Sequence, residues 1–147
     1  MIGLIQRVQA AQVEVGGELI GKVNQGILLL LGVQREDTEA NADKLLHKVI
    51  NYRIFEDDDG KMNNSLLDIQ GELLVVSQFT LPANTKKGMR PSFTSAADPV
   101  LGRAMYDYFV QQAEASSLSH PIQTGEFGAD MQVSLINDGP VTFWLEV

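Results

Sequence analysis

The run Ile27-Leu28-Leu29-Leu30-Leu31-Gly32-Val33 is apolar at every position apart from a single glycine. A strand with one face in water alternates polar and apolar residues, whereas a strand covered on both faces reads as an unbroken apolar run. We therefore predict that residues 27–33 form a central strand with other layers packed on both sides. The rest of the chain must supply those layers.

Upstream of this run, residues 1–15 have the character of a strand interrupted by polar side chains. Gly16-Gly17 then separates Val13-Glu14-Val15 from Glu18-Leu19-Ile20. Two glycines between two such segments are typical of a two-residue hairpin turn. The sequence therefore predicts a hairpin with its turn at Gly16-Gly17.

Two helices are predicted downstream. Asp37-Thr38 opens the first helix, whose apolar side carries Ala42, Leu45, Leu46, Val49 and Ile50. Asp98-Pro99 opens the second, because proline is favoured in a first helical turn. Its expected apolar side carries Leu101, Ala104, Met105, Tyr108 and Phe109.

The remaining segments complete a mixed pattern. We expect an irregular stretch over residues 56–64, a strand over 72–79 and a loop-rich segment over 82–97. Three short strands are expected to finish the chain, the last with one face formed by Val141, Phe143, Leu145 and Val147. Without a linker, repeat or shift in composition, residues 1–147 are predicted to form a single α+β domain.

Composition narrows the functional classes. The chain has no cysteine, which excludes disulfides, a thiol nucleophile and thiolate metal ligands. Its longest apolar run is too short to span a membrane, and its first residues lack a signal peptide, so we expect a cytoplasmic protein without membrane contact. A net charge of −8 argues against a broad nucleic-acid surface; the one concentrated positive stretch is Lys86-Lys87 with Arg90.

The usual groups for hydrolysis are scarce. His47 lies on the polar side of the first predicted helix and His120 in a loop, so we predict neither a Ser-His-Asp arrangement nor a zinc site. The acidic segment 56–60 is followed by Lys61, where a calcium loop would need a ligand. We therefore predict chemistry without a metal or cofactor.

Two segments at strand ends are candidates for the site. Ser77-Gln78-Phe79-Thr80-Leu81 follows the apolar run 73–76, and Asn137-Asp138-Gly139-Pro140-Val141-Thr142 follows residues 133–136. Proline cannot donate to a strand ladder, so Pro140 predicts a bulge, an edge or a cis bond. For an X-Pro bond the cis form lies only about 0.5–1 kcal/mol above trans. A tight turn between two strands is the alternative.

These two segments resemble the signature motifs of the D-aminoacyl-tRNA deacylases, which hydrolyse D-amino acids from mischarged tRNA. Other stretches are similar to the same family: Met1 to Val8, Tyr52 to Phe55, Gly60 to Asn63, Gly88 to Phe93, and Ala129 to Val147. The resemblance implies a barrel-like, mostly antiparallel β core with two outer helices, paired as a homodimer. It also implies the acceptor end of aminoacyl-tRNA as the partner.

For this reaction the residues favour backbone chemistry. Thr80 has no base among its sequence neighbours, so we expect it to bind or orient the substrate and not to form a covalent intermediate. The N–H groups of Gln78, Phe79 and Thr80 could stabilise an oxyanion, and the ribose 2′-hydroxyl could activate water. Ser77 is expected to bind substrate, although for both Ser77 and Thr80 capping of a strand end is an equal interpretation.

Selection of the D configuration is expected to come from rigid backbone. The resemblance implies that Gly139-Pro140 of one subunit enters the partner's pocket and rejects L side chains by clash. Glycyl-tRNA should then also be hydrolysed. We expect Arg7 to support this unit at the interface, although a surface arginine is the alternative. Three residues are candidates for the terminal adenosine site, or else for apolar core: Met89, Phe127 and Met131.

Two other functions fit the same residues. One is a non-catalytic dimeric β module that binds nucleotides or RNA ends, and the other is a general esterase for small D-amino acid esters. A deacylation assay with D- and L-charged tRNA beside a free amino ester separates the three.

Overall fold

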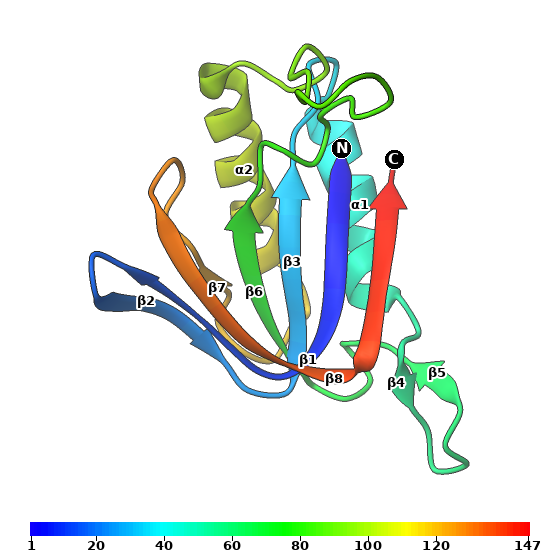
Figure 1. Cartoon of the computed structure of the whole chain (residues 1–147). Coiled ribbons are helices and arrows are strands. Elements are labelled where there is room, and N and C mark those ends of the chain that lie inside the picture. Colours follow the sequence, from blue (N-terminus) through cyan, green and yellow to red (C-terminus); the bar gives the residue numbers. More distant parts are fainter.

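The computed structural model describes all residues from 1 to 147, and its central element is the predicted strand, β3 (Gly26–Gly32) (Figure 1). The six-stranded sheet has the order β2-β1-β3-β6-β7, with β8 paired to β1. The β3–β6 and β6–β7 pairs are parallel, and β1 pairs antiparallel with β2, β3 and β8. The other sheet strands are β1 (Ile2–Val15), β2 (Glu18–Val23), β6 (Glu72–Ser77), β7 (Gln123–Thr124) and β8 (Met131–Glu146).

The sheet curls into a nearly closed, barrel-like shape, as expected. The first part of β1 pairs with β3 and its last part with β2, while β8 follows β1 along almost its whole length. The predicted hairpin joins β1 to β2, and Gly16 and Gly17 have φ values of 58° and 84°. These left-handed values are easily reached by glycine.

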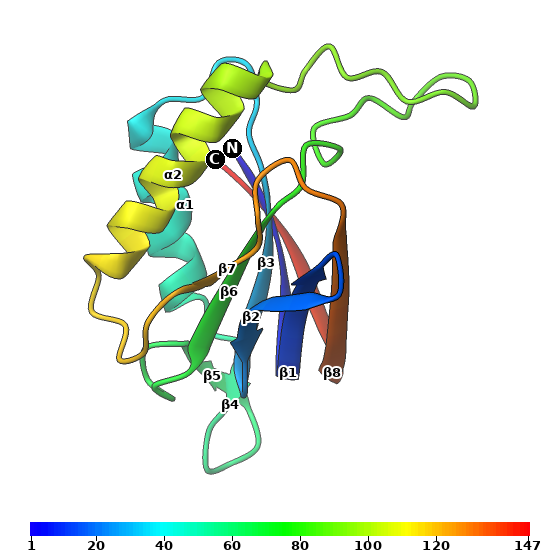
Figure 2. The same cartoon turned by 90° about the vertical axis from the view of Figure 1, so that its left-hand side faces the viewer.

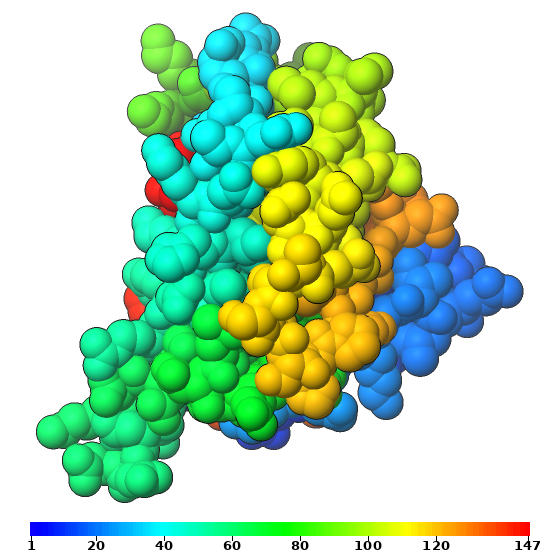
Figure 3. Space-filling view, turned by 180° about the vertical axis from the view of Figure 1, so that it is seen from behind, coloured from blue at the N-terminus to red at the C-terminus, as the bar shows by residue number.

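Two helices cover one face of the sheet, α1 (Glu39–Asn51) and α2 (Pro99–Glu114) (Figure 2). Seen from the helix side, they lie side by side over much of the molecule (Figure 3). Thr38 caps α1, and the Asp98 carboxylate caps α2 by accepting from the N–H groups of Val100 and Leu101. All five predicted inner residues of α1 are buried.

The predicted inner face of α2 was partly wrong. Ala104 is exposed, and the fully buried positions are Gly102, Tyr106, Phe109 and Ala113. The apolar residues of this helix fit more than one face. The Tyr106 hydroxyl decides the orientation because it donates a 2.9 Å hydrogen bond to the buried Val75 carbonyl.

The ends of several elements also differ from the prediction. Residues 56–64 are not irregular throughout, since β4 (Phe55–Glu56) and β5 (Met62–Asn64) form a small hairpin. The chain does not finish with three short strands but with two-residue β7 and sixteen-residue β8. On the last part of β8, Val141 and Leu145 are buried, whereas Phe143 is partly exposed against Tyr52.

The two faces of the sheet differ in cover. On the helix side, alternate residues of β3 and β6 such as Leu29 and Val75 join the main core with α1 and α2. On the other side, Leu28 and Val76 join a smaller cluster enclosed by the curl of the sheet. Neither α1 nor α2 has the length and hydropathy of a membrane-spanning helix.

Candidate functional site

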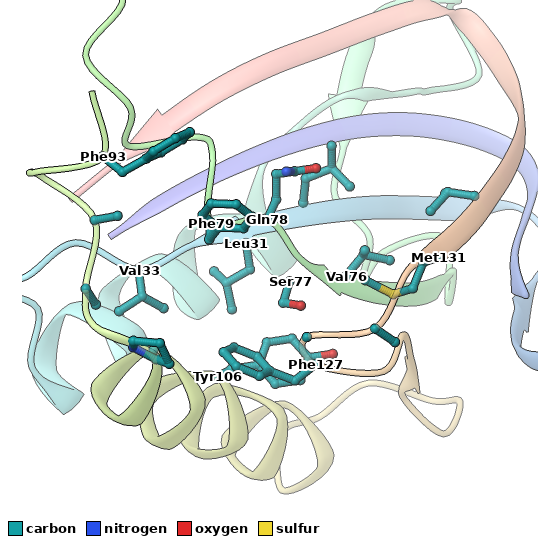
Figure 4. Close-up of a pocket in the computed structure, with 18 of the residues that line it drawn as sticks. Leu31, Val33, Val76, Ser77, Gln78, Phe79, Phe93, Tyr106, Phe127 and Met131 are labelled. Carbon is teal, nitrogen blue, oxygen red and sulfur yellow. The ribbon is translucent and has the colours of Figure 1, made fainter. Parts of the chain in front are cut away.

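A cavity of about 740 Å³ lies where β3 and β6 end against α2 (Figure 4). Most of its lining is apolar, and it extends from α2 around to the concave side of the sheet. Ser77, Gln78 and Phe79 line it at the end of β6, and Phe127 and Met131 line it from the segment that leads into β8. The structure thus brings five of the predicted site residues to one cavity.

The segment after β6 forms a tight turn beside the cavity. The Gln78 N–H donates to the Leu31 carbonyl at 2.8 Å, and the Leu81 N–H donates back to the Gln78 carbonyl at 3.3 Å. The N–H groups of Phe79 and Thr80, between these two, donate no hydrogen bond within the chain. The backbone donors of Phe79 and Thr80 are therefore free, and that of Gln78, the third predicted donor, is already used. Phe79 lines the apolar cavity, whereas Thr80, the next residue of the turn, lies outside its lining.

Gly32 allows this turn to sit close to β3. A Cβ atom at position 32 would lie 2.8 Å from Leu81 Cβ and 3.0 Å from Pro82 Cδ. Both contacts are too short for carbon atoms, and neither neighbour is the free end of a flexible side chain. The position of the turn therefore depends on the missing side chain.

Thr80 has no base within hydrogen-bonding distance. Its hydroxyl oxygen accepts from the Gln78 side-chain amide at 2.5 Å, and the hydroxyl makes no hydrogen bond to an ionisable group. The one charged residue that lines the cavity is Asp98, whose carboxylate is occupied in capping α2. Both histidines lie outside the cavity lining, and no three His, Asp or Glu side chains gather in one place.

An aromatic wall, formed by Tyr106 and Phe127, closes one side of the cavity. The two rings lie 5.7 Å apart, and the Arg103 guanidinium sits 5.6 Å from the Phe127 ring, held by Asp107 at 2.7 Å. Burial raises the pKa of Tyr106 to about 12, so its hydroxyl stays protonated as a donor. The sequence interpretation missed Tyr106, although an aromatic residue with a polar tip inside an amphipathic helix was the available signal.

Phe79 and Met89 differ in their surroundings. Phe79 is two-thirds exposed and packs on Phe93, with ring centroids 5.3 Å apart at the cavity edge. Met89, a candidate for the adenosine site, is fully exposed and does not line the cavity. Phe93, which does line it, was not singled out from the sequence.

The Gly139–Pro140 bond is cis, as predicted, and both residues are exposed within β8. Arg7, only 6% exposed, holds the preceding residue: its Nε donates to the Asp138 carbonyl at 2.8 Å and lies 3.3 Å from the Asp138 carboxylate. Its Nη1 donates to the Ile54 carbonyl at 2.6 Å. Arg7 therefore anchors this unit within its own chain.

The two signature segments do not meet within one chain. Arg7, which holds Asp138 beside the dipeptide, marks its level in the sheet. At that level Arg7 of β1 pairs with Ile27 of β3, and Ile27 pairs with Leu73 of β6. Ser77 lies four residues farther along β6. At about 3.3 Å per residue, the dipeptide and Ser77 are offset by roughly 13 Å along the strands, and they lie several strands apart.

Comparison with known proteins gives one consistent result. A family model described as D-Tyr-tRNA(Tyr) deacylase matches residues 4–146. Proteins named D-aminoacyl-tRNA deacylase from Pseudoalteromonas translucida (strain TAC 125) and Haemophilus influenzae (strain PittEE) are 65% and 59% identical, each over 100% of both chains.

Two solved structures have the same fold. One, titled "c-Myc DNA Unwinding Element Binding Protein", is 42% identical with a TM-score of 0.95, covering 100% of this chain and 99% of the other. The second, a probable eukaryotic D-amino acid tRNA deacylase, has a TM-score of 0.84, covering 99% and 98%. At 15% identity it supports the fold alone.

Proposed function

The chain belongs to the D-Tyr-tRNA(Tyr) deacylase family, and we propose that it hydrolyses the ester bond of D-aminoacyl-tRNA, releasing a free D-amino acid and tRNA. The observation that carries this proposal is the pair of free N–H groups of Phe79 and Thr80, which lie in the turn whose residues Gln78 and Phe79 line the apolar cavity. Charged tRNA is a cytoplasmic substrate, so the proposal places the enzyme there.

Backbone donors supply the electrostatic part of the mechanism. Attack of water on the ester carbon places negative charge on the carbonyl oxygen, and the N–H groups of Phe79 and Thr80 would stabilise it. A preorganised donor of this kind contributes a factor of about 10²–10³ in rate. Phe79 and Thr80 thus act through main-chain atoms, while Gln78 positions the Thr80 hydroxyl with its side-chain amide.

The substrate supplies the acid–base part. The cavity offers no free side-chain base, because the carboxylate of Asp98 caps α2. The 2′-hydroxyl of the terminal ribose lies next to the ester and can pass a proton from the attacking water to the departing 3′-oxygen. The bond between the acyl carbon and this oxygen breaks, leaving a carboxylic acid that ionises and a free tRNA end. No metal enters this scheme.

The terminal adenosine fits the aromatic side of the cavity. Phe127 offers an aromatic face and Met131 a polarisable thioether, and both suit stacking with a base. Ser77 lies between this side and the turn that carries the free donors (Figure 4). The base would then hold the ester beside the N–H groups of Phe79 and Thr80.

Selection of the D configuration requires a second copy of the chain in this proposal. Gly139-Pro140 is exposed, firmly held through Arg7 and Asp138, and well separated from the turn of its own chain. In a homodimer the dipeptide of one subunit would enter the other's cavity and occupy the direction of an L side chain. Glycine has no side chain, so glycyl-tRNA should also be hydrolysed.

A side-by-side deacylation assay tests the function. D-tyrosyl-tRNA, L-tyrosyl-tRNA, glycyl-tRNA and D-tyrosine ethyl ester are incubated with the protein, with and without a chelator. We expect turnover of the D-tyrosyl and glycyl esters of tRNA, little turnover of the L ester, and no effect of the chelator. Binding of tRNA without turnover would support the non-catalytic module instead, and equally fast hydrolysis of the ethyl ester would support a general esterase.

A further inference from the structure

The loop from Asn84 to Ser92, here called the basic loop, carries positive charges close to cavity-lining residues in the sequence. It carries Lys86, Lys87 and Arg90, and no acidic residue occurs anywhere from position 77 to 97. None of the three cations forms an ion pair; those of the chain involve the Met1 amino group, Arg7 and Arg103. On a protein with a net charge of −8, the basic loop is therefore a local positive region.

The basic loop is anchored at the mouth of the cavity. Its ends are joined by two backbone hydrogen bonds between Asn84 and Ser92, of 2.8 and 3.0 Å. The next residue, Phe93, lines the cavity and packs on Phe79, beside the free backbone donors (Figure 4). Every residue of the loop is exposed, and it projects from the end of the sheet on the side away from the helices (Figure 2).

We propose that the basic loop binds the phosphodiester backbone of the RNA strand whose terminal ester occupies the cavity. This inference rests on the proposed function and adds the surface that holds the RNA. A strand that enters the cavity by its terminal nucleoside must leave through the mouth, where its last phosphates meet Lys86, Lys87 and Arg90. The acidic remainder of the surface repels the rest of the nucleic acid, so the ionic contact is confined to this loop.

The test compares two sets of three substitutions. The loop variant is Lys86→Gln, Lys87→Gln and Arg90→Gln. The control variant carries Lys22→Gln, Lys44→Gln and Lys61→Gln, which remove the same charge from exposed positions outside the cavity lining. Each protein is assayed on D-tyrosyl-tRNA and on D-tyrosyl-adenosine, an ester without phosphates, over a range of salt concentrations.

We expect the loop variant to raise KM for D-tyrosyl-tRNA about 10- to 100-fold at low salt with kcat unchanged. The slope of log(kcat/KM) against log[salt] is negative and should become less steep by about 2, since each of the three contacts to a single strand contributes about 0.7 to its magnitude. Turnover of D-tyrosyl-adenosine should not change, and the control variant should match the wild type on both esters.

Three results would overturn the proposal. The first is an unchanged KM and salt slope in the loop variant, and the second is an equal loss on both esters. The third is a loss of dimer in the loop variant, which would assign the cations to a subunit contact. Fluorescence anisotropy with uncharged tRNA measures the binding of RNA by wild type and loop variant without any hydrolysis. A wild-type protein that binds RNA but hydrolyses neither ester would refute the proposed deacylase function and leave the proposed RNA contact of the loop standing.

Discussion

At the scale of single residues, the chemistry depends on hydrogen bonds that the chain leaves unmade. The N–H groups of Phe79 and Thr80 have no partner, and the neighbouring Gln78 N–H is used by the Leu31 carbonyl. The sequence indicated the segment but could not separate these three donors. That distinction depends on how β6 pairs with β3, which brings together residues more than forty positions apart.

Replacement of the Phe79 amide by an ester, through incorporation of phenyllactic acid, removes one donor and keeps the side chain. We expect kcat on D-tyrosyl-tRNA to fall about 10²- to 10³-fold, because the oxyanion loses one of its two donors. The control replaces the amide of Asp58 by an ester in the same way, with the hydroxy acid that keeps the aspartate side chain. Asp58 is exposed and outside the cavity lining, and its N–H donates no backbone hydrogen bond. An unchanged kcat in the Phe79 ester would exclude this N–H group from catalysis.

Thr80→Ala should retain most of the activity, with kcat reduced less than about tenfold. The hydroxyl accepts one hydrogen bond from Gln78 and has no adjacent base, so it cannot act as an activated nucleophile. Mass spectrometry of the quenched wild-type enzyme during turnover should show no acylated protein. Detection of an acyl group on Thr80 would contradict the mechanism.

At the level of helices and strands, the sequence predicted the features that depend on neighbouring residues. It did not predict those that depend on packing between distant segments. The hairpin at Gly16-Gly17 and the inner face of α1 follow from residues close in sequence, and both were confirmed. The inner face of α2 is decided by Tyr106 reaching Val75 in another element. The length of β8 is decided by its partner β1, which continues past the interruption at Pro140.

Gly32→Ala should move the turn that follows β6. Its Cβ would meet Leu81 and Pro82 at 2.8 and 3.0 Å, so the turn must shift or the protein loses about 1–3 kcal/mol of stability. We expect kcat on D-tyrosyl-tRNA to fall at least tenfold while the protein stays folded by circular dichroism. The matched variant is Gly3→Ala, whose Cβ meets the flexible end of Leu29 at 2.9 Å and should retain its kcat.

Tyr106 ties α2 to β6, and its ionisation should weaken the fold at high pH. Burial raises its pKa from 10 to about 12, so the unfolded chain loses this proton first. The contribution to the free energy of unfolding is complete below pH 10 and is lost as the pH rises toward 12. Tyr106→Phe should cost about 1 kcal/mol at pH 8. Urea unfolding should show a smaller decrease between pH 10 and 12 for Tyr106→Phe than for the wild type.

At the scale of the whole molecule, the sheet face opposite the helices carries apolar side chains in contact with water. Trp144 is 51% exposed, and its pairing with Leu4 places it on the face opposite Ile5 and Leu145 of the main core. An exposed tryptophan beside the partly exposed Leu4 is typical of a surface that another protein covers. This surface supports the proposed homodimer, in which each cavity receives Gly139-Pro140 from the other subunit.

The proposed homodimer has a shared site, in which one subunit supplies the turn and the other supplies Gly139-Pro140. It is tested by mixing two inactive variants, Gly32→Val, which displaces the turn, and Gly139→Val. Gly139 has a φ of +140°, and an added Cβ would lie 2.8 Å from the Val141 nitrogen, so valine must distort that segment. In the proposed dimer Gly139 lies inside the partner's cavity, so a valine side chain there would obstruct the ester itself, and each variant alone should be inactive on D-tyrosyl-tRNA.

The deciding measurement is the rate of D-tyrosyl-tRNA deacylation by mixed dimers, purified through two different affinity tags after co-expression. A site shared between subunits leaves one cavity with an intact turn and an intact dipeptide, so we predict about half of the wild-type rate per dimer. If each site used only residues of its own chain, both cavities of the mixed dimer would carry a defect. Mixed dimers that are as inactive as the parent variants would therefore contradict the shared site.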